Sequence, residues 1–318
     1  MTAIRASNMS SEQFWNQGDA GKILAKHGKT FNWARRFLGQ NQSEQATRLY
    51  AFCRYLDDIA DGDIGGGVTA LSDIKIMLAN KHSPDNPVIA DFIEIADKIN
   101  IDFAVLDALL EGLVEDQSDV LFESRRDLLR YSYKVAGTVG LMMCDVLDCT
   151  DARAKPFALD LGIAMQLTNI ARDVVTDAEM DRRYLPGRWC MDLSPIQIRM
   201  VGNDGETEKR LLVQAAIEEL LDLADVYYAS GFKGLAFLSP RAQFAIGVAG
   251  HAYKEIGEKI RQNGYRFWEG RVVVSPTGKV LKSFDSLFTF KNRFNKAAIH
   301  DTSLHKHLEG LPYVSQNR

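Results

Sequence analysis

The sequence predicts an all-α protein of about eight to twelve helices. Proline is scarce, with eight residues in a chain of 318, about half of the usual ~5%. The stretches 88–155 and 196–239 contain none, which leaves room for long helices because proline breaks helix interiors. Apolar residues recur mostly at spacings of three and four, as on one face of a helix. Only residues 271–275 (RVVVS) look like a strand.

Composition and charge exclude several classes of protein. The 38 basic and 42 acidic residues give a net charge of −4, and the sequence has no basic stripe typical of nucleic-acid binding. No run approaches the ~18 apolar residues of a membrane span. The four cysteines show no regular spacing, and the first residues (MTAIRASNMSSEQF) lack the apolar core of a signal peptide. We therefore expect a cytoplasmic protein with reduced thiols.

The chain is expected to form one helical domain at residues 1–290 and a C-terminal tail at 291–318. Loops at 62–68 (GDIGGGV), at 80–87 (NKHSPDNP) and around Pro186 separate the helices, and no repeat or low-complexity segment divides the chain.

The tail carries three histidines, His300, His305 and His307. Histidine is a common metal ligand, but no acidic or cysteine partner lies at ligand spacing near them. A solvated tail is therefore favoured over a metal site.

Residues 43–61 (SEQATRLYAFCRYLDDIAD) are expected to form a first acidic helix. Ser43 is suited to cap its N-terminus, and Gly62 is suited to end it. The apolar residues that step by three and four along its core face are Leu49, Phe52, Leu56 and Ile59.

The other side of this helix is acidic at its C-terminal end. Arg54, Asp57 and Asp61 share a stripe, and Asp58 lies at its edge. These aspartates repel one another and sit at the negative end of the helix dipole. A bound divalent cation would offset this, and a set of oxygen ligands suits Mg²⁺ or Mn²⁺. A solvated acidic surface beside a loop explains the same pattern equally well.

Residues 160–181 are expected to form a second acidic helix. Its polar residues step by three, four and four along one face, beside an apolar stripe, and they are Gln166, Asn169, Asp173 and Asp177. The two amides do not favour a helix, and so this face suits a helix that lines a cavity. Asn and Asp oxygens one turn apart can hold a single hard cation.

Arginines accompany both acidic faces. Arg172, Arg182, Arg183 and Tyr184 suit an anionic, oxygen-rich ligand such as phosphate. A diphosphate would be repelled by bare carboxylates, so cations held by the two helices must lie between them. No glycine-rich loop of the GxGxxG or GxxxxGK[ST] type is present, and nucleotide-binding folds are unsupported.

Small residues are concentrated between the two acidic helices, in YSYKVAGTVG at 131–140. They favour close helix packing, and they also suit the wall of a long apolar tunnel that residues 232–247 would extend. A diphosphate site beside an apolar pocket indicates a prenyl diphosphate, whose carbocation a dry aromatic pocket would shield.

Together these segments resemble the squalene/phytoene synthase family. The motifs are CRYLDDIAD at 53–61, YSYKVAGTVG at 131–140 and QLTNIARDVVTDAEMDRRYLP at 166–186. The resemblance covers nearly the whole chain, with GKTF at 28–31 in place of the commoner SKSF. Residues 228–257 look most like the bacterial phytoene synthases. The resemblance implies the isoprenoid (terpenoid) synthase fold, a single helical domain around a central cavity.

The resemblance also implies roles for individual residues. The metal-binding positions are Asp57, Asp61, Asn169, Asp173 and Asp177. The diphosphate-contacting positions are Lys29, Arg54, Arg172, Arg182, Tyr184, Tyr253 and Arg271. Tyr131 and Gln166 fall near the reacting carbons, and Tyr131 forms the catalytic set with the four metal-binding aspartates.

The implied activity is a Mg²⁺-dependent, head-to-head condensation of two geranylgeranyl diphosphates to phytoene through prephytoene diphosphate. It belongs to carotenoid biosynthesis and needs no NADPH. The alternative in the same family makes dehydrosqualene or squalene from two farnesyl diphosphates, and one sequence does not show the pocket depth that decides between them. A non-catalytic scaffold and a plain helical binding module are the competing classes. The greasy substrate favours peripheral contact with the inner face of a membrane.

Overall fold

The computed structural model of the chain describes residues 20–83, 85–204, 207–272 and 298–314. Within these ranges the protein is all-α, as predicted, and its only β-type pairing is an isolated bridge between Leu121 and Arg183. The strand-like residues 273–275 lie outside the described residues. No helix in the described ranges is long and apolar enough to cross a membrane.

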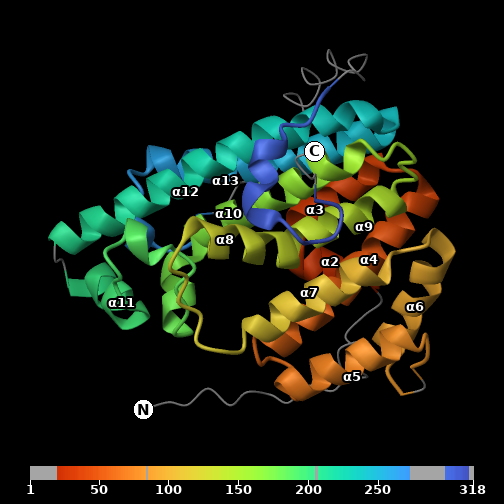
Figure 1. Cartoon of the computed structure of the whole chain (residues 1–318), viewed down its shortest axis with the longest axis horizontal. Coiled ribbons are helices and arrows are strands. Elements are labelled where there is room, and N and C mark those ends of the chain that lie inside the picture. Colours follow the sequence, from red (N-terminus) through yellow and green to blue (C-terminus); the bar gives the residue numbers. More distant parts are fainter. Residues whose placement is uncertain (1–19, 84, 205–206, 273–297, 315–318) are drawn as a thin grey trace.

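Twelve α-helices, α2 to α13, make up the described part of the chain (Figure 1). They are α2 (Ala20–His27), α3 (Lys29–Ala34), α4 (Gln40–Ala60), α5 (Gly67–Ala79), α6 (Pro87–Ile99), α7 (Phe103–Glu115), α8 (Arg125–Ser132), α9 (Thr138–Val146), α10 (Ala154–Glu179), α11 (Pro195–Asp204), α12 (Thr207–Gly234) and α13 (Pro240–Gln262). Shorter segments are η1 (Arg35–Phe37), the π-helical η2 (Tyr133–Gly137), η3 (Gly187–Trp189), η4 (Leu235–Phe237), η5 (Phe267–Glu269) and η7 (Thr302–Leu308).

Helix α10 is the central element of the fold. It packs against α12, α9, α13 and α11, and Figure 1 shows it in the middle of the molecule beside the long helices α12 and α13. The predicted apolar stripe is its core face, and the buried residues of this stripe are Ile163, Leu167, Ile170 and Val174. The neighbouring amide and carboxylate stripe is only partly buried, so α10 divides a core on one side from a polar space on the other.

The boundaries of the two acidic helices differ in part from those expected. Ser43 does not cap α4, because its N–H already bonds to the carbonyl of Gly39 (2.8 Å), and the helix begins at residue 40. Gly62 does follow the end of α4 as predicted, with a left-handed φ of 80°. Helix α10 begins six residues earlier than residue 160, because Pro156 lies in its first turn, where proline is tolerated.

The small residues of the 131–140 motif allow close contact between helices. Helix α8, the π-helical turn η2 and helix α9 follow one another without a break in the chain. A Cβ atom on Gly140 would lie 2.3 Å from the carbonyl oxygen of Ala158, and one on Gly162 would lie 2.4 Å from that of Ala136. The close-packing interpretation is therefore confirmed: α10 touches η2 and α9 backbone to backbone.

The C-terminal segment 298–314 folds back onto the helices, across α8 in Figure 1. Tyr227 Oη donates to the carbonyl of Leu304 (2.8 Å), and Tyr133 Oη donates to that of Pro312 (2.7 Å). His305 is completely buried. The prediction of a solvated tail is therefore wrong for these residues. The side chains that bind the segment lie far away in the sequence, so local patterns do not reveal them.

Candidate active site

The ends of three helices meet at one pocket. It has a volume of about 550 Å³ and is lined by residues from the end of α4, the end of α7 and the segment after α10. Arg182 donates from Nη1 to Asp61 Oδ1 (2.9 Å) and from Nη2 to the carbonyl of Ala60 (3.2 Å). This arginine therefore links the segment after α10 to the end of α4.

Asp57 on α4 lies in an enclosed but wet environment. Its side chain is exposed to solvent, and yet the surrounding protein raises the pKa of its carboxyl group to about 7. Removal from bulk water is the main cause, and the charges of Asp61 and Asp116 add to it in spite of nearby Arg54. Asp57 therefore faces solvent beside the other carboxylates of the site.

Asp177 on α10 has the same character. Burial raises the pKa of its carboxyl group to about 8, and Asp173, Asp116 and Asp61 contribute by repulsion. Asp61 belongs to the C-terminal end of α4 and Asp116 to that of α7. Carboxylates from three helices are therefore close enough to hinder one another's ionisation.

The donor set of this cavity fits a hard divalent cation. Asn169 donates from Nδ2 to Gln166 Oε1 (3.3 Å), while its own Oδ1 is buried and accepts no hydrogen bond within the described residues. An unpaired amide oxygen one turn from a carboxylate, among carboxylates that repel one another, is the kind of oxygen ligand set that Mg²⁺ takes. The predicted metal-binding residues of α4 and α10 thus fit the group that the sequence implies.

Two arginines surround Asp173. Arg172 donates from Nε to Asp173 Oδ1 (2.9 Å), and Arg271 Nε lies 3.0 Å from the same oxygen. Tyr253 lies beside them: burial raises the pKa of its hydroxyl group, and the two arginine charges oppose that rise. The ring of Phe31 lies 5.4 Å from that of Tyr253. Three of the predicted diphosphate contacts therefore form one cluster.

Two other predicted contacts lie apart from this cluster. Arg54 pairs with Asp58 one turn along α4 and lies 3.9 Å from Asp63. Lys29 is exposed at the first residue of α3, and within the described ranges it makes no ion pair with a site residue. Contact of Lys29 and Arg54 with a diphosphate stays a prediction.

Asp116 is a site residue that the sequence analysis missed. It follows α7, is 7% exposed, and accepts hydrogen bonds from Tyr131 Oη and Tyr184 Oη, both at 2.6 Å. The two tyrosine rings stack with centroids 4.9 Å apart. Burial raises the pKa of Asp116, while these hydrogen bonds oppose the rise. One feature of the sequence could have indicated that Asp116 is buried. It lies three residues after buried Leu113 and so continues the apolar stripe of α7.

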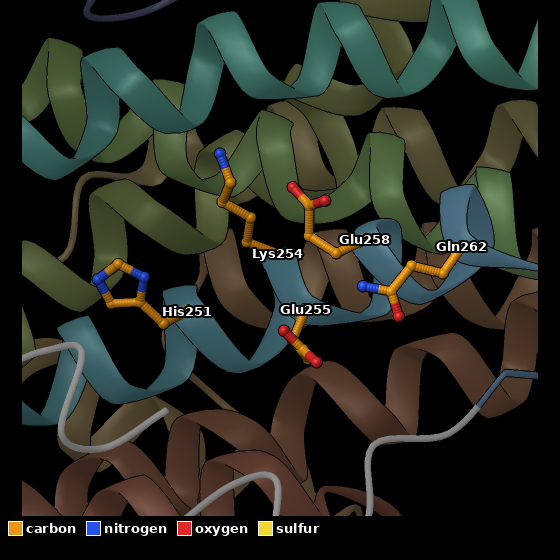
Figure 2. Close-up of a pocket in the computed structure, with 5 residues that line it drawn as sticks. All are labelled: His251, Lys254, Glu255, Glu258 and Gln262. Carbon is orange, nitrogen blue, oxygen red and sulfur yellow. The ribbon is translucent and has the colours of Figure 1, made fainter. Parts of the chain in front are cut away.

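A second pocket of about 310 Å³ runs along α13 and contains none of the predicted site residues. Figure 2 shows the polar side chains that line it along one stretch of this helix. Lys254 among them pairs with Asp225 of α12 (2.7 Å). The functional groups that converge in space are those of the first pocket and the arginine cluster.

Fold and site together define an all-α protein with an acidic, arginine-flanked cavity suited to cations and a diphosphate. The family described as squalene/phytoene synthase matches residues 24–277. This chain belongs to the squalene/phytoene synthase family.

Relatives agree with this membership. A phytoene synthase from Pseudescherichia vulneris is 33% identical over 276 residues, which span 82% of this chain and 87% of that protein. A 15-cis-phytoene synthase from Paracoccus sp. is 34% identical over 270 residues, which span 81% and 86% of the two chains.

Solved structures share the fold. A dehydrosqualene synthase in complex with a ligand superimposes with a TM-score of 0.77 at 27% identity, and the match covers 88% of this chain and 98% of that one. A squalene synthase from Alicyclobacillus acidocaldarius gives a TM-score of 0.67 at 19% identity, covering 83% and 99%. The predicted isoprenoid synthase fold is thereby confirmed.

Proposed function

We propose that this protein is a 15-cis-phytoene synthase, which condenses two geranylgeranyl diphosphates head to head and releases diphosphate. The observation that carries the proposal is the convergence of carboxylates from α4, α7 and α10 with Arg182 between them. Such a site needs cations, and cations with arginines suit a diphosphate. The relatives named phytoene synthase support the twenty-carbon substrate.

The residues that would hold Mg²⁺, or Mn²⁺ in its place, are Asp57, Asp61, Asn169, Asp173 and Asp177. When bound, these ions would supply Lewis-acid stabilisation of the negative charge on the departing diphosphate. The chain contributes the repelling carboxylates that make a cation favourable there, and the buried oxygen of Asn169 that lacks another partner.

The arginines would bind the phosphate oxygens directly. Arg172 and Arg271 share Asp173, and Arg182 holds Asp61. Each guanidinium has five N–H donors, so it can keep one carboxylate contact and turn other donors to a phosphate. The flanking arginines therefore orient the diphosphate while the carboxylates face the cations.

The reaction balances without a redox cofactor. The carbon–oxygen bond of one substrate breaks, its electron pair leaves with diphosphate, and an allylic cation remains. The double bond of the second substrate attacks this cation, and proton loss closes the cyclopropane ring of prephytoene diphosphate. A second ionisation, rearrangement and proton loss give phytoene. Released diphosphate is the proton acceptor, and Tyr131 and Gln166 lie near the reacting carbons.

Tyr131 is held for this role by Asp116. Its hydroxyl group donates to the carboxylate at 2.6 Å, which fixes the position of the ring. An aromatic face stabilises a nearby carbocation, and this is the role proposed for the Tyr131 ring.

The test is to incubate the purified protein with geranylgeranyl diphosphate or farnesyl diphosphate, each with Mg²⁺ and without NADPH, and to identify products by mass. Phytoene from the first substrate is the expected result. Failure to form a C40 product would overturn the proposal.

Dehydrosqualene or squalene synthesis from two farnesyl diphosphates is the second candidate function. It is favoured by the similarity to a solved dehydrosqualene synthase, whereas the relatives at 33% and 34% identity favour phytoene. The same experiment decides between the two. A synthase of this second kind would form a C30 product from farnesyl diphosphate and no C40 product from geranylgeranyl diphosphate. NADPH added in a parallel sample would reveal squalene.

We further propose that the protein works in the cytoplasm. We expect it to contact a membrane surface there, because its substrate and product carry long apolar chains. Co-sedimentation of the protein with lipid vesicles is the expected result, and full recovery in the supernatant would contradict it.

A further inference from the structure

A buried polar cluster lies at the opposite end of α10 from the active site. Its centre is Asp160, which precedes Asp173 by 13 residues, or about 20 Å of helix. His300 and His305 reach it from the C-terminal segment, and Ser230 reaches it from α12. None of these groups takes part in the proposed reaction.

The three groups around Asp160 contact it directly. His300 Nε2 lies 2.8 Å from Oδ2, His305 Nε2 lies 3.0 Å from Oδ1, and Ser230 Oγ donates to Oδ2 at 2.5 Å. Asp160 and His305 are fully buried, and the side chain of His300 is 8% exposed. One ligand atom from each of Asp160, His300 and His305 lies within 4.8 Å of the others.

The cluster carries charge in apolar surroundings. Burial disfavours ionisation of Asp160, but hydrogen bonds from the two imidazoles keep the pKa of this carboxyl group below its usual value. The ring of Phe157 packs edge-on against His300, with centroids 5.2 Å apart. A buried carboxylate needs a compensating positive charge, which either a protonated imidazole or a bound cation can supply.

We propose that Asp160, His300 and His305 form a binding site for a transition-metal ion, with Zn²⁺ as the best match. Two imidazole nitrogens and one carboxylate oxygen are typical zinc ligands, whereas Mg²⁺ prefers oxygen alone. Ser230 donates to Oδ2 of the carboxylate and would serve as an outer-shell partner that orients it. A water molecule would complete the four ligands of a tetrahedral zinc ion.

The distances agree with this assignment after a small adjustment. Ligand atoms ~2.0–2.1 Å from a tetrahedral zinc are about 3.3 Å apart. His300 Nε2 lies 2.8 Å from Oδ2 and His305 Nε2 lies 3.0 Å from Oδ1, and one ligand atom from each of the three residues lies within 4.8 Å of the others. Side-chain rotations would bring these three atoms to the zinc spacing.

The metal would join segments that are 140 and 145 residues apart in the chain. It would hold η7 against α10 and leave the catalytic cavity untouched. The expected role is therefore structural, and its loss should lower thermal stability.

The test uses full-length protein without a histidine tag, stripped with a chelator and kept in millimolar Mg²⁺ so that the catalytic ligands are occupied. Zn²⁺ is then added, and bound zinc and melting temperature are measured. We expect about one tightly bound zinc per chain and a rise of several degrees in melting temperature. Co²⁺ in its place should give the visible absorption of a tetrahedral site.

The controls are chosen within the same segment. His305→Ala should lose the zinc and the stabilisation, whereas His307→Ala, also in η7 but outside the cluster, should keep both. If His305→Ala does not fold, His300→Gln at the edge of the site replaces it. The proposal is overturned if the wild type binds no zinc under these conditions, or if both cluster variants bind as much zinc as the wild type. The cluster would then hold the C-terminal segment by hydrogen bonds alone.

Discussion

Asp116 shows how one side chain can organise a site without belonging to a recognisable motif. Its two oxygens hold Tyr131 and Tyr184 at 2.6 Å, and its charge adds to the repulsion felt by Asp57 and Asp177. We therefore regard it as a positioning residue that also contributes to the negative potential of the cavity.

Replacing Asp116 with Asn should lower kcat by about 10²-fold with a smaller effect on KM, because an amide preserves the shape but removes the charge that orients the tyrosine hydroxyls. Steady-state kinetics with geranylgeranyl diphosphate would measure this. Glu115→Gln is the matched control, since the adjacent carboxylate is exposed and pairs with Lys134 instead. A variant with wild-type kcat would show that Asp116 has only a packing role.

The raised pKa values of Asp57 and Asp177, about 7 and about 8, link stability to pH. In the unfolded chain both groups would titrate near ~3.9. The folded protein therefore holds protons that the unfolded chain has released. The stabilisation from these protons is complete below about pH 4 and is lost as the pH rises through 7 and 8.

Metal-free protein should therefore lose melting temperature as the pH rises from about 4 to about 8, and Mg²⁺ should restore much of it. Asp177→Asn should flatten this pH dependence and weaken the response to Mg²⁺. Glu179→Gln, an exposed neighbour at the end of the same helix, should behave like the wild type. Equal pH slopes in wild type and Asp177→Asn would rule out this linkage.

At the scale of elements, α10 serves three purposes along its length. Its N-terminal part carries Asp160, its middle touches η2 and α9 at Gly162, and its C-terminal part carries the acidic face. The close backbone contacts at the middle of α10 fix its position against η2 and α9. Because closely packed backbones leave little room to shift, both ends of α10 are then held beside their partners.

Gly140→Ala should lower the free energy of unfolding by about 1–3 kcal/mol, since the new Cβ would meet the Ala158 carbonyl oxygen at 2.3 Å. Chemical denaturation would measure the change. Gly257→Ala in α13 is the control: its Cβ would meet only the end of the Leu221 side chain, at 3.2 Å. That substitution should be neutral or stabilising because alanine favours a helix. Equal effects at the two positions would contradict the packing argument.

At the scale of the whole molecule, the site exists because helices from both halves of the chain converge. Asp61 and Arg182 are 121 residues apart in the chain, yet Arg182 Nη1 lies 2.9 Å from Asp61 Oδ1. Cations and diphosphate should therefore bind cooperatively, since each offsets the repulsion that the other meets.

Inorganic diphosphate with Mg²⁺ should raise the melting temperature by more than the sum of the shifts caused by each alone. Asp61→Asn should reduce the joint shift, while Asp63→Asn, an exposed carboxylate just beyond α4, should leave it nearly unchanged. Additive shifts would favour a helical binding module with merely solvated acidic faces.

The sequence by itself determined the helical class, the two acidic faces and the family, because all of these rest on local periodicity and on motifs of contiguous residues. It also located the end of α4 at Gly62, where a left-handed backbone conformation favours glycine. It misplaced the start of that helix, because residues 40–42 have no strong capping signal and the helix extends through them.

Only the tertiary structure decided which residues outside the motifs matter. Asp116 looks like any acidic helix end until Tyr131 and Tyr184 close over it. The histidines of the C-terminal segment look solvated until Asp160, 140 residues earlier, is found beneath His300. The physical reason is the same in both cases: the burial and pairing of a charged group depend on contacts between distant segments, and no local pattern in the chain records them.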